Sequence, residues 1–294
     1  MSSKKKILIQ LDSDPMPSVF DRVVAVDAGA DHVFSYGGVT PDQVRDLVYG
    51  AIFTRGPDDL KSTALFVGGS DVTRAEENFK RARGSFLGPL RVSVLLDCAG
   101  ANTTAAAAVV AAHRSLPLED TRALVLAATG PVGRRVARLL ARRGAQVRVA
   151  SRQLDRSTQV AESVRAVVDG ARVQPVVVEG IKDLEAALAG IGLVVAAGGP
   201  GVQLLPREQR LRANTTPMAN ALRMVIDLNA VPPVGIEGVE PTDSGVEKDG
   251  MITYGAIGVG GIKMKIHKAA VARLFESRDL ILDAEEVLEL GLSL

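Results

Sequence analysis

Residues 121–152 read TRALVLAATGPVGRRVARLLARRGAQVRVASR, and this stretch decides the fold. The apolar run 123–127 predicts a buried strand, and the run 146–150 predicts a second one. Between them, behind the glycine-bearing turn 128–133, apolar residues recur at the spacing of an amphipathic helix. A strand, a tight turn, a helix and a second strand in this order are typical of a dinucleotide-binding unit.

The turn between strand and helix carries the residues that would approach a bound dinucleotide. Gly130 lets the backbone come close to a pyrophosphate, and Gly133 lets the helix pack close to the strand. Ala128 stands where such turns usually have their first glycine. Free N–H groups and the positive end of the helix dipole attract phosphate. We therefore predict that this turn binds the cofactor through Thr129, Gly130, Pro131, Val132 and Gly133.

The residues after the second strand indicate which dinucleotide is bound. Enzymes that use NAD usually place an Asp or Glu about twenty residues past the glycines, where it binds the ribose. This chain has Ser151 and Arg152 there, followed by Arg156. A carboxylate would repel a 2′-phosphate, whereas a hydroxyl and a guanidinium bind it. The alternative is a solvated surface arginine, but the missing acid favours NADP, with NAD as the weaker alternative.

Composition and charge argue against several classes of protein. The 294 residues are 47% apolar and 3% aromatic, which describes an aliphatic α/β protein large enough for two domains. A net charge of +1, without basic stretches interleaved with aromatics, argues against nucleic-acid binding. No apolar stretch is long enough to span a membrane, and the first one meets Asp12 too soon for a signal peptide. We therefore expect a cytoplasmic protein.

Cysteine and histidine are too few, and too widely spaced, to indicate a metal site. Cys98 is the single cysteine, so neither a disulfide framework nor a thiolate cluster is expected. His32, His113 and His267 show no metal-ligand spacing, and we predict that no metal is bound. For His113 and His267, structural roles are the simpler interpretation.

Strands alternate with helices along the rest of the chain, which predicts mainly parallel sheets. In an open α/β sheet the ligand lies beyond the carboxyl ends of the strands. The predicted strands 193–196 and 224–226 would end at that edge. We therefore expect their loops to border the cofactor through Ala197, Gly198 and Asn229.

A glycine cluster near the end of the chain precedes a predicted helix that continues to about residue 276. Residues 254–267 read YGAIGVGGIKMKIH. Glycines that open a helix let a flat ring or a phosphate approach the backbone, which makes Gly258 and Gly260 candidate cofactor contacts. The alternative is a hinge between two domains. Both interpretations can hold, because cofactor clefts often lie at hinges.

Four strings occur together in one order: LFVGGSD (65–71), ATGPVG (128–133), DLNAVPPVGIEG (227–238) and GAIGVGGIKMKIH (255–267). With them, the chain resembles the NAD(P)-dependent methylene-tetrahydromethanopterin dehydrogenases of methylotrophic bacteria over nearly its whole length. The strings are long and specific, so chance similarity does not explain them.

The resemblance implies an α/β fold with two domains and a cleft between them. A Rossmann-type NADP-binding domain would cover residues 119–258. A second α/β domain, for the substrate, would cover residues 1–118 and be completed by helices within 259–294. The reaction implied is oxidation of the methylene carbon of a reduced pterin carrier to the methenyl level, with hydride transfer to NADP, in one-carbon metabolism.

The chemistry of this reaction needs few acid or base groups. Hydride leaves a carbon flanked by two nitrogens, and the resulting cation is delocalised over both, so no proton moves in that step. Holding two flat rings face to face is most of the task. Lys263, just inside the predicted helix, is the residue that we expect to orient the substrate. A positive charge beside a developing cation would oppose hydride departure, so we assign it to a carbonyl or other oxygen and not to base catalysis.

Six residues of the first part of the chain are candidate contacts to the pterin. Asp97 and Asn102 follow a predicted strand and suit the donor and acceptor edge of such a ring. The alternative for Asn102 with Thr103 is helix capping, and the alternative for Phe20 is a place in the core. The predicted substrate-binding set is Ser18, Phe20, Lys61, Asp97, Asn102 and Thr103.

Two other functions remain open at this point. One is an NADP-dependent dehydrogenase of the shikimate type, which would need a Lys/Asp pair for proton transfer to a hydroxyl. The other is a non-catalytic NADP-binding sensor. The resemblance favours the pterin enzyme, and leaves open whether tetrahydromethanopterin, tetrahydrofolate or both are used. It also suggests a homo-oligomer.

Overall fold

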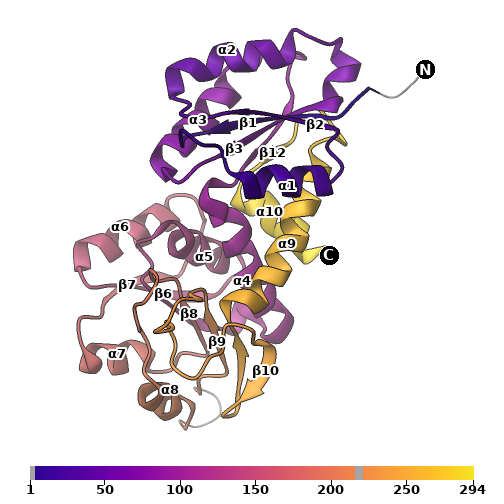
Figure 1. Cartoon of the computed structure of the whole chain (residues 1–294). Coiled ribbons are helices and arrows are strands. Elements are labelled where there is room, and N and C mark those ends of the chain that lie inside the picture. The colour runs from indigo at the N-terminus through magenta and orange to yellow at the C-terminus, as the bar shows by residue number, and fades with distance from the viewer. Residues whose placement is uncertain (1–3, 216–220) are drawn as a thin grey trace. The chain divides into compact units, whose positions relative to one another are not determined.

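The computed structural model describes residues 4–215 and 221–294. The chain forms two compact units, the first made of residues 1–103 and 264–294 and the second of residues 104–263 (Figure 1). Both boundaries fall inside helices, α4 (Ala101–Ser115) and α9 (Ala256–Arg273). The boundary expected at residue 118 falls after α4, whereas the second unit already starts at Thr104.

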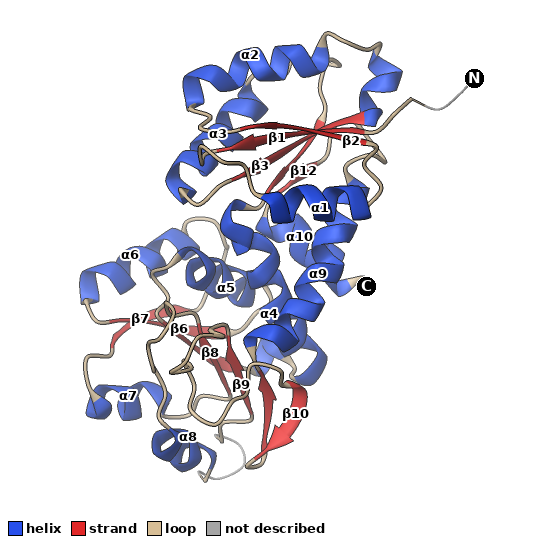
Figure 2. Cartoon of the chain, in the orientation of Figure 1, coloured by secondary structure: helices blue, strands red, loops and turns tan. Residues whose placement is uncertain are grey.

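The first unit is built on a five-stranded parallel sheet in the order β12-β4-β3-β1-β2. Figure 2 shows α2 and α3 on one face of this sheet and α1 and α10 on the other. Its strands are β1 (Ile7–Asp12), β2 (His32–Tyr36), β3 (Thr63–Gly68), β4 (Ser93–Leu96) and β12 (Ile281–Leu282). Its helices are α1 (Val19–Asp27), α2 (Pro41–Ile52), α3 (Val72–Gly84) and α10 (Ala284–Leu292).

The core of the first unit follows from its sequence pattern. Every residue of the central strand β3 is buried, as expected for a parallel strand covered on both faces. The apolar residues Val44 and Val48 of α2 and Phe79 of α3 pack against this sheet. Helix α2 begins at a capping box, in which the Thr40 N–H donates to the Gln43 side chain at 3.0 Å.

The second unit is built on a seven-stranded sheet in the order β10-β11-β9-β8-β5-β6-β7. All neighbouring strands are parallel except the pair β10 and β11. Its strands are β5 (Arg122–Leu126), β6 (Gln146–Ser151), β7 (Val173–Val177), β8 (Leu193–Ala196), β9 (Met224–Asp227), β10 (Ser244–Lys248) and β11 (Met251–Tyr254). The sheet order reverses between β5 and β8, and ligands of doubly wound sheets bind at that point.

Helices α5 and α6 lie on one side of this sheet and α7 and α8 on the other (Figure 2). Their bounds are α5 (Pro131–Arg142), α6 (Leu154–Arg165), α7 (Ile181–Leu188) and α8 (Arg207–Asn214). The predicted Rossmann-type α/β architecture is confirmed. None of the helices in the described ranges has the length and apolar character needed to cross a bilayer.

The sequence-based interpretation of the glycine cluster needs a correction. Helix α9 begins at Ala256, so Gly258 and Gly260 lie inside the helix and do not form a loop before it. A Cβ added to Gly258 would lie 1.8 Å from the Asp243 carbonyl oxygen, and one added to Gly260 would meet nothing within 4 Å. The glycine at 258 is therefore required by close packing of the helix against the chain at Asp243.

The interpretation of the sequence also missed a hairpin. Strands β10 and β11 are joined by Asp249 and Gly250, whose φ angles are 51° and 72°. Two residues with positive φ are the mark of a type I′ turn, and Asp-Gly is one of its preferred sequences. The signal was therefore present in the sequence. Helix α8 and the two-residue strand β12 were not expected either.

Candidate functional site

The turn from β5 to α5 has the tight geometry that the sequence predicts. A Cβ added to Gly133 would lie 2.8 Å from the Ala128 Cα, so only glycine allows this approach of helix and strand. Ala128 replaces the usual first glycine, but the residue with the unfavourable backbone conformation is the one before it. Ala127 has a φ of 53°, in the left-handed region that disfavours residues with a Cβ. Ala128 is fully buried.

A pocket of about 450 Å³ opens beside this turn, at the carboxyl ends of β5, β6 and β7. It contains five of the predicted cofactor residues: Thr129, Ser151, Arg152, Arg156 and Gly198. The lining is Leu126, Ala127, Thr129, Ala150, Ser151, Arg152, Gln153, Arg156, Val178, Gly198, Gly199, Val202 and Leu204. We call this the dinucleotide pocket. The ends of separate strands thus bring together residues that the sequence analysis predicted to bind the same cofactor.

The end of the dinucleotide pocket at β6 is basic. Arg152 and Arg156 are exposed, and no Asp or Glu is among the described residues that line the pocket. Among the described residues, neither guanidinium forms an ion pair. The Ser151 hydroxyl accepts a hydrogen bond of 3.2 Å from the Gln153 N–H, which fixes its place at the strand end. The arrangement offers charge and donors to an anionic group.

The start of α5 also fits an anion. Its N-cap is Gly130, which has no side chain to satisfy the first N–H groups of the helix. Pro131 has no N–H, so Val132 and Gly133 carry the donors of the first turn that point out of the helix. A Cβ added to Gly130 would meet nothing closer than 3.9 Å, so the backbone is open on this side. These residues fit the pyrophosphate of a dinucleotide.

Other predicted cofactor residues have partners of their own. The Ala197 N–H donates to the Leu126 carbonyl at 3.1 Å, as part of the strand end. The Asn229 amide donates to the carbonyls of Val231 and Pro233 at 3.0 and 3.2 Å, which closes the prolyl turn. Neither Asn229 nor the helical glycines Gly258 and Gly260 line the dinucleotide pocket. Their contact with the cofactor stays a prediction.

The loop after β9 is held by a buried carboxyl group. Asp227 accepts hydrogen bonds from the N–H groups of Asn229 at 3.0 Å and Ile236 at 2.8 Å. Burial raises the pKa of Asp227, and the backbone donors only partly oppose this effect. A Cβ added to Gly235 would lie 2.7 Å from this carboxylate. The conformation of this loop therefore depends on Asp227.

Eight residues that line the pocket were not predicted from the sequence: Leu126, Ala127, Ala150, Gln153, Val178, Gly199, Val202 and Leu204. Val178 follows β7, so the rule that ligands lie beyond strand ends would have found it. Gln153 adjoins the predicted basic pair. Val202 and Leu204 lie in a segment without helix or strand and carry no local signal.

In the first unit, the carboxyl ends of β1, β3 and β4 carry a network of hydrogen bonds. The Asp12 carboxylate accepts from the N–H groups of Asp14 at 2.9 Å and Ser18 at 3.0 Å. Asp14 in turn accepts from the Ser70 N–H and hydroxyl. Ser18 also caps α1, through the Asp21 N–H at 3.2 Å. The predicted substrate residue Ser18 therefore has a clear structural role.

Asp97, Asn102 and Thr103 form one buried cluster at the start of α4. Asp97 accepts from the N–H groups of both other residues and from the Thr103 hydroxyl at 2.6 Å. The Asn102 amide donates to the Leu96 carbonyl at 2.7 Å and to Asp283 at 2.9 Å. These are the contacts of a helix N-terminus, the alternative that the sequence left open. Binding of the pterin by these residues stays a prediction.

The remaining predicted substrate residues lie in different places. Phe20, on α1, is 49% exposed, and its ring centre lies 6.0 Å from that of His267. His267 is buried and stacks on Phe66, so it belongs to the core of the first unit. Lys61 lies before β3, at the opposite end of the strand from Asp12 and Asp97, so the structure does not bring it to them. Lys263 is half-buried in the middle of α9.

Comparison with known proteins identifies the family. Residues 19–99 match the family described as "Methylene-tetrahydromethanopterin dehydrogenase, N-terminal". A Methylorubrum extorquens protein named "Bifunctional protein MdtA" is 43% identical over 291 residues, which cover 98% of each chain. The chain belongs to the methylene-tetrahydromethanopterin dehydrogenase family. It is therefore an NAD(P)-dependent oxidoreductase of one-carbon metabolism.

Further relatives agree with this family and with the fold. The NAD(P)-dependent methylenetetrahydromethanopterin dehydrogenase of Methylorubrum extorquens is 30% identical, over 94% of each chain. The shikimate 5-dehydrogenase of Listeria monocytogenes has a TM-score of 0.52 at 14% identity, covering 97% of this chain and 96% of its own. The quinate dehydrogenase of Corynebacterium glutamicum has a TM-score of 0.50 at 17% identity, covering 99% and 100%. At such identities these two structures show a shared two-domain fold and no shared substrate.

Proposed function

We propose that this member of the methylene-tetrahydromethanopterin dehydrogenase family oxidises methylene-tetrahydromethanopterin to the methenyl form with NADP. The observation that carries the cofactor choice is the dinucleotide pocket, where Ser151, Arg152 and Arg156 lie at the strand end and no carboxylate lines the site. A guanidinium pair binds a 2′-phosphate, which NAD lacks. The substrate follows from the family and from the name of the 30% identical relative.

We assign binding of the dinucleotide to the second unit. The first turn of α5, through Val132 and Gly133, would hold the pyrophosphate, and Arg152 with Arg156 would hold the 2′-phosphate. When bound, the nicotinamide supplies the acceptor for the hydride. The protein therefore has to bind, orient and exclude water, and these tasks need no general base.

The reduced pterin is assigned to the first unit and to Lys263. The hydride would leave the methylene carbon with its electron pair and pass to the bound cofactor, so the methenyl product would carry its positive charge over two nitrogens. Since no proton moves, Lys263 is proposed to orient the substrate through an oxygen. Its replacement in Lys263→Met should lower kcat/KM and leave NADP affinity unchanged. A kinetic pKa that disappears in this variant would instead identify a proton-transfer group.

The test of the proposed function is an assay of the purified chain with two carriers and two cofactors. Methylene-tetrahydromethanopterin and methylene-tetrahydrofolate are each offered with NADP and with NAD, and formation of the reduced nicotinamide is followed. We expect the highest kcat/KM with NADP and the methanopterin carrier. The folate carrier is included because the resemblance leaves the choice between the two carriers open. Turnover of shikimate, or of neither pterin, would contradict the proposal.

A further inference from the structure

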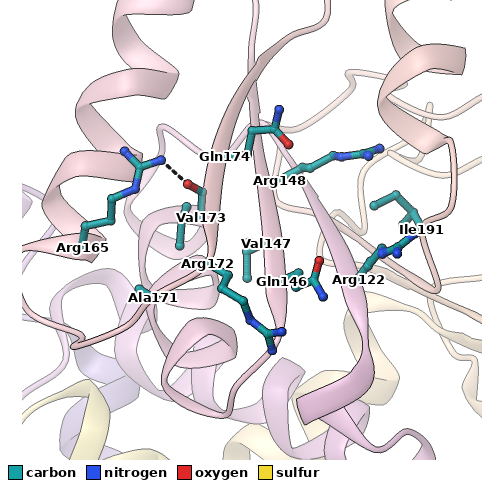
Figure 3. Close-up of a pocket in the computed structure, with 10 residues that line it drawn as sticks. All are labelled: Arg122, Gln146, Val147, Arg148, Arg165, Ala171, Arg172, Val173, Gln174 and Ile191. Carbon is teal, nitrogen blue, oxygen red and sulfur yellow. Dashed lines mark hydrogen bonds between the residues drawn. The ribbon is translucent and has the colours of Figure 1, made fainter.

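A second pocket of the second unit lies at the amino ends of the strands, whereas the dinucleotide pocket lies at their carboxyl ends. It has a volume of about 490 Å³, which is within the usual range for a small-molecule site. Figure 3 shows its lining: Arg122, Gln146, Val147, Arg148, Arg165, Ala171, Arg172, Val173, Gln174 and Ile191. We call it the arginine pocket. It is bordered by the first residues of β5, β6 and β7, whereas the dinucleotide pocket is bordered by the last.

Strand register brings these side chains together. Arg122 pairs with Gln146 across β5 and β6, and Arg148 pairs with Gln174 across β6 and β7. Paired residues of parallel strands project to the same face, and so do residues two apart on one strand. These four long polar side chains therefore share one face of the sheet. A sheet face buried against a helix would be apolar here, so this corner of the sheet is built to remain open to solvent.

The arginine pocket is strongly basic, and its described lining contains no acidic residue. Four of its ten lining residues are arginines, and none is Asp or Glu. Within the part of the chain that the structure describes, none of these four guanidinium groups forms an ion pair. The whole chain has 34 acidic residues against 35 basic ones, so a cluster of this kind is a local departure from a balanced surface. The charge of the pocket is left for a ligand to neutralise.

Main-chain carbonyl groups hold three of the arginines in place. Arg148 donates to the carbonyls of Ala187 at 2.7 Å and Ala189 at 2.9 Å, at the end of α7. Arg172 donates to the Glu119 carbonyl at 3.0 Å and to the Gly144 carbonyl. Arg165 donates to the Val173 carbonyl, the bond drawn in Figure 3. Carbonyl oxygens bear no formal charge, and each guanidinium has five N–H donors, so positioned donors remain for an anion.

The positive charges of the pocket repel one another. Burial lowers the pKa of Arg148, and the nearby positive charge of Arg122 lowers it further. A bound anion would relieve this repulsion, because it would place negative charge between the two guanidinium groups. Val147, Val173 and Ile191 line the site but are buried, so the surface that it offers to a ligand is mainly polar. One small inorganic ion would fill little of such a volume.

We propose that the arginine pocket is a second ligand site, which binds a small polyanion carrying at least two phosphate groups. The inference rests on the geometry of the second unit alone and does not depend on the substrate of the enzyme. Arginine suits this ligand because its planar fork binds phosphate oxygens in pairs. The site lies about one strand length, roughly 17 Å, from the dinucleotide pocket, so both ligands can be bound together.

Binding is tested by titration calorimetry of the full chain saturated with NADP, which occupies the dinucleotide pocket. The probes are inorganic triphosphate and ATP, and they distinguish a site for the phosphate chain from one that also uses the organic part. We expect both probes to bind with similar affinity, through their phosphate groups. Absence of binding by both probes at millimolar concentration would overturn the proposal.

Two variants locate the binding. Arg122 is exposed, and Arg122→Glu should fold normally while placing a carboxylate beside Arg148, so affinity for triphosphate should fall about tenfold or more. Arg172→Gln should weaken it by a similar factor. The matched control is Arg114→Glu, an exposed arginine that lines neither pocket. Equal affinity in Arg122→Glu and Arg114→Glu, or loss of triphosphate binding on saturation with NADP, would place the anion elsewhere and sink the idea.

Discussion

At the scale of single residues, the shape and charge of the dinucleotide pocket depend on Ala127 and Arg152. Ala127 keeps a left-handed φ of 53° although a Cβ makes this conformation unfavourable by about 1 kcal/mol. The surrounding strand and helix hold it there. Arg152 occupies the place where a carboxylate would bind the ribose of NAD. The first residue shapes the turn, and the second is the residue that we propose selects NADP.

The prediction at this scale concerns Arg152→Ala. The variant should lose roughly 1.5–3 kcal/mol of NADP binding, the contribution of a charge-assisted hydrogen bond to a phosphate. Affinity for NAD should change much less, because NAD has no 2′-phosphate. Fluorescence titration of the reduced cofactors measures both, and Arg114→Ala is the control for loss of a distant exposed arginine. A variant that treats the two cofactors as the wild type does would refute the assignment.

At the scale of elements, helix α9 shows how packing overrides a sequence pattern. Its glycines indicate a loop, since glycine is a poor helix former. The helix nevertheless begins at Ala256, because Gly258 lets it approach the carbonyl of Asp243. The same helix contains Gly260, around which there is open space. Close packing therefore requires a glycine at 258 but not at 260, although the two positions are only two residues apart.

This difference predicts opposite effects of the same substitution. Gly258→Ala should destabilise the chain by about 3 kcal/mol, because its Cβ would overlap the Asp243 carbonyl and force the backbone apart. Gly260→Ala should stabilise it by about 0.5–1 kcal/mol, through the better helix propensity of alanine. Urea unfolding followed by circular dichroism measures both free energies of unfolding. Equal effects of the two substitutions would show that the packing argument is wrong.

At the scale of the whole molecule, stability depends on pH through buried carboxyl groups. Asp243 is buried between the hairpin β10–β11 and the chain before it, and Lys248 lies 2.7 Å from one of its oxygens. Burial of this carboxyl group raises its pKa. Hydrogen bonds from Lys248, the Glu240 N–H and Thr253 together outweigh burial, so the pKa is lowered overall.

A lowered pKa in the folded state means that the Asp243 carboxylate stabilises the fold above the ordinary pKa of aspartate, about 3.9. This stability is lost as the pH falls through the folded-state pKa. Asp243→Asn should therefore cost about 2 kcal/mol at pH 7, and the difference from wild type should shrink at acid pH. Urea unfolding at pH values from 7 down through about 3.9 measures how this difference in the free energy of unfolding changes with pH. The exposed Asp169→Asn is the control. A difference that does not vary with pH would show that the charge is not responsible.

Much of the fold and part of the candidate site are encoded locally, and local patterns are legible in a sequence. The strand, turn and helix at 121–142 follow from apolar periodicity and one glycine pair, and Ser151 with Arg152 follows from spacing along a strand. The Asp249-Gly250 turn was equally legible, although it was overlooked. In each case the signal lies within a few residues, because hydrogen bonds of helices and turns join close neighbours in the chain.

Other features depend on contacts between segments distant in sequence, which no local pattern records. Val202 and Leu204 join the dinucleotide pocket only because the chain after β8 returns to β5. Arg122 and Arg148 line the same pocket because strand pairing places β5 beside β6. Position 258 requires a glycine because the Asp243 carbonyl packs against the helix there. Pairing register and close packing place these residues, and both depend on the complete arrangement of the sheet and its helices.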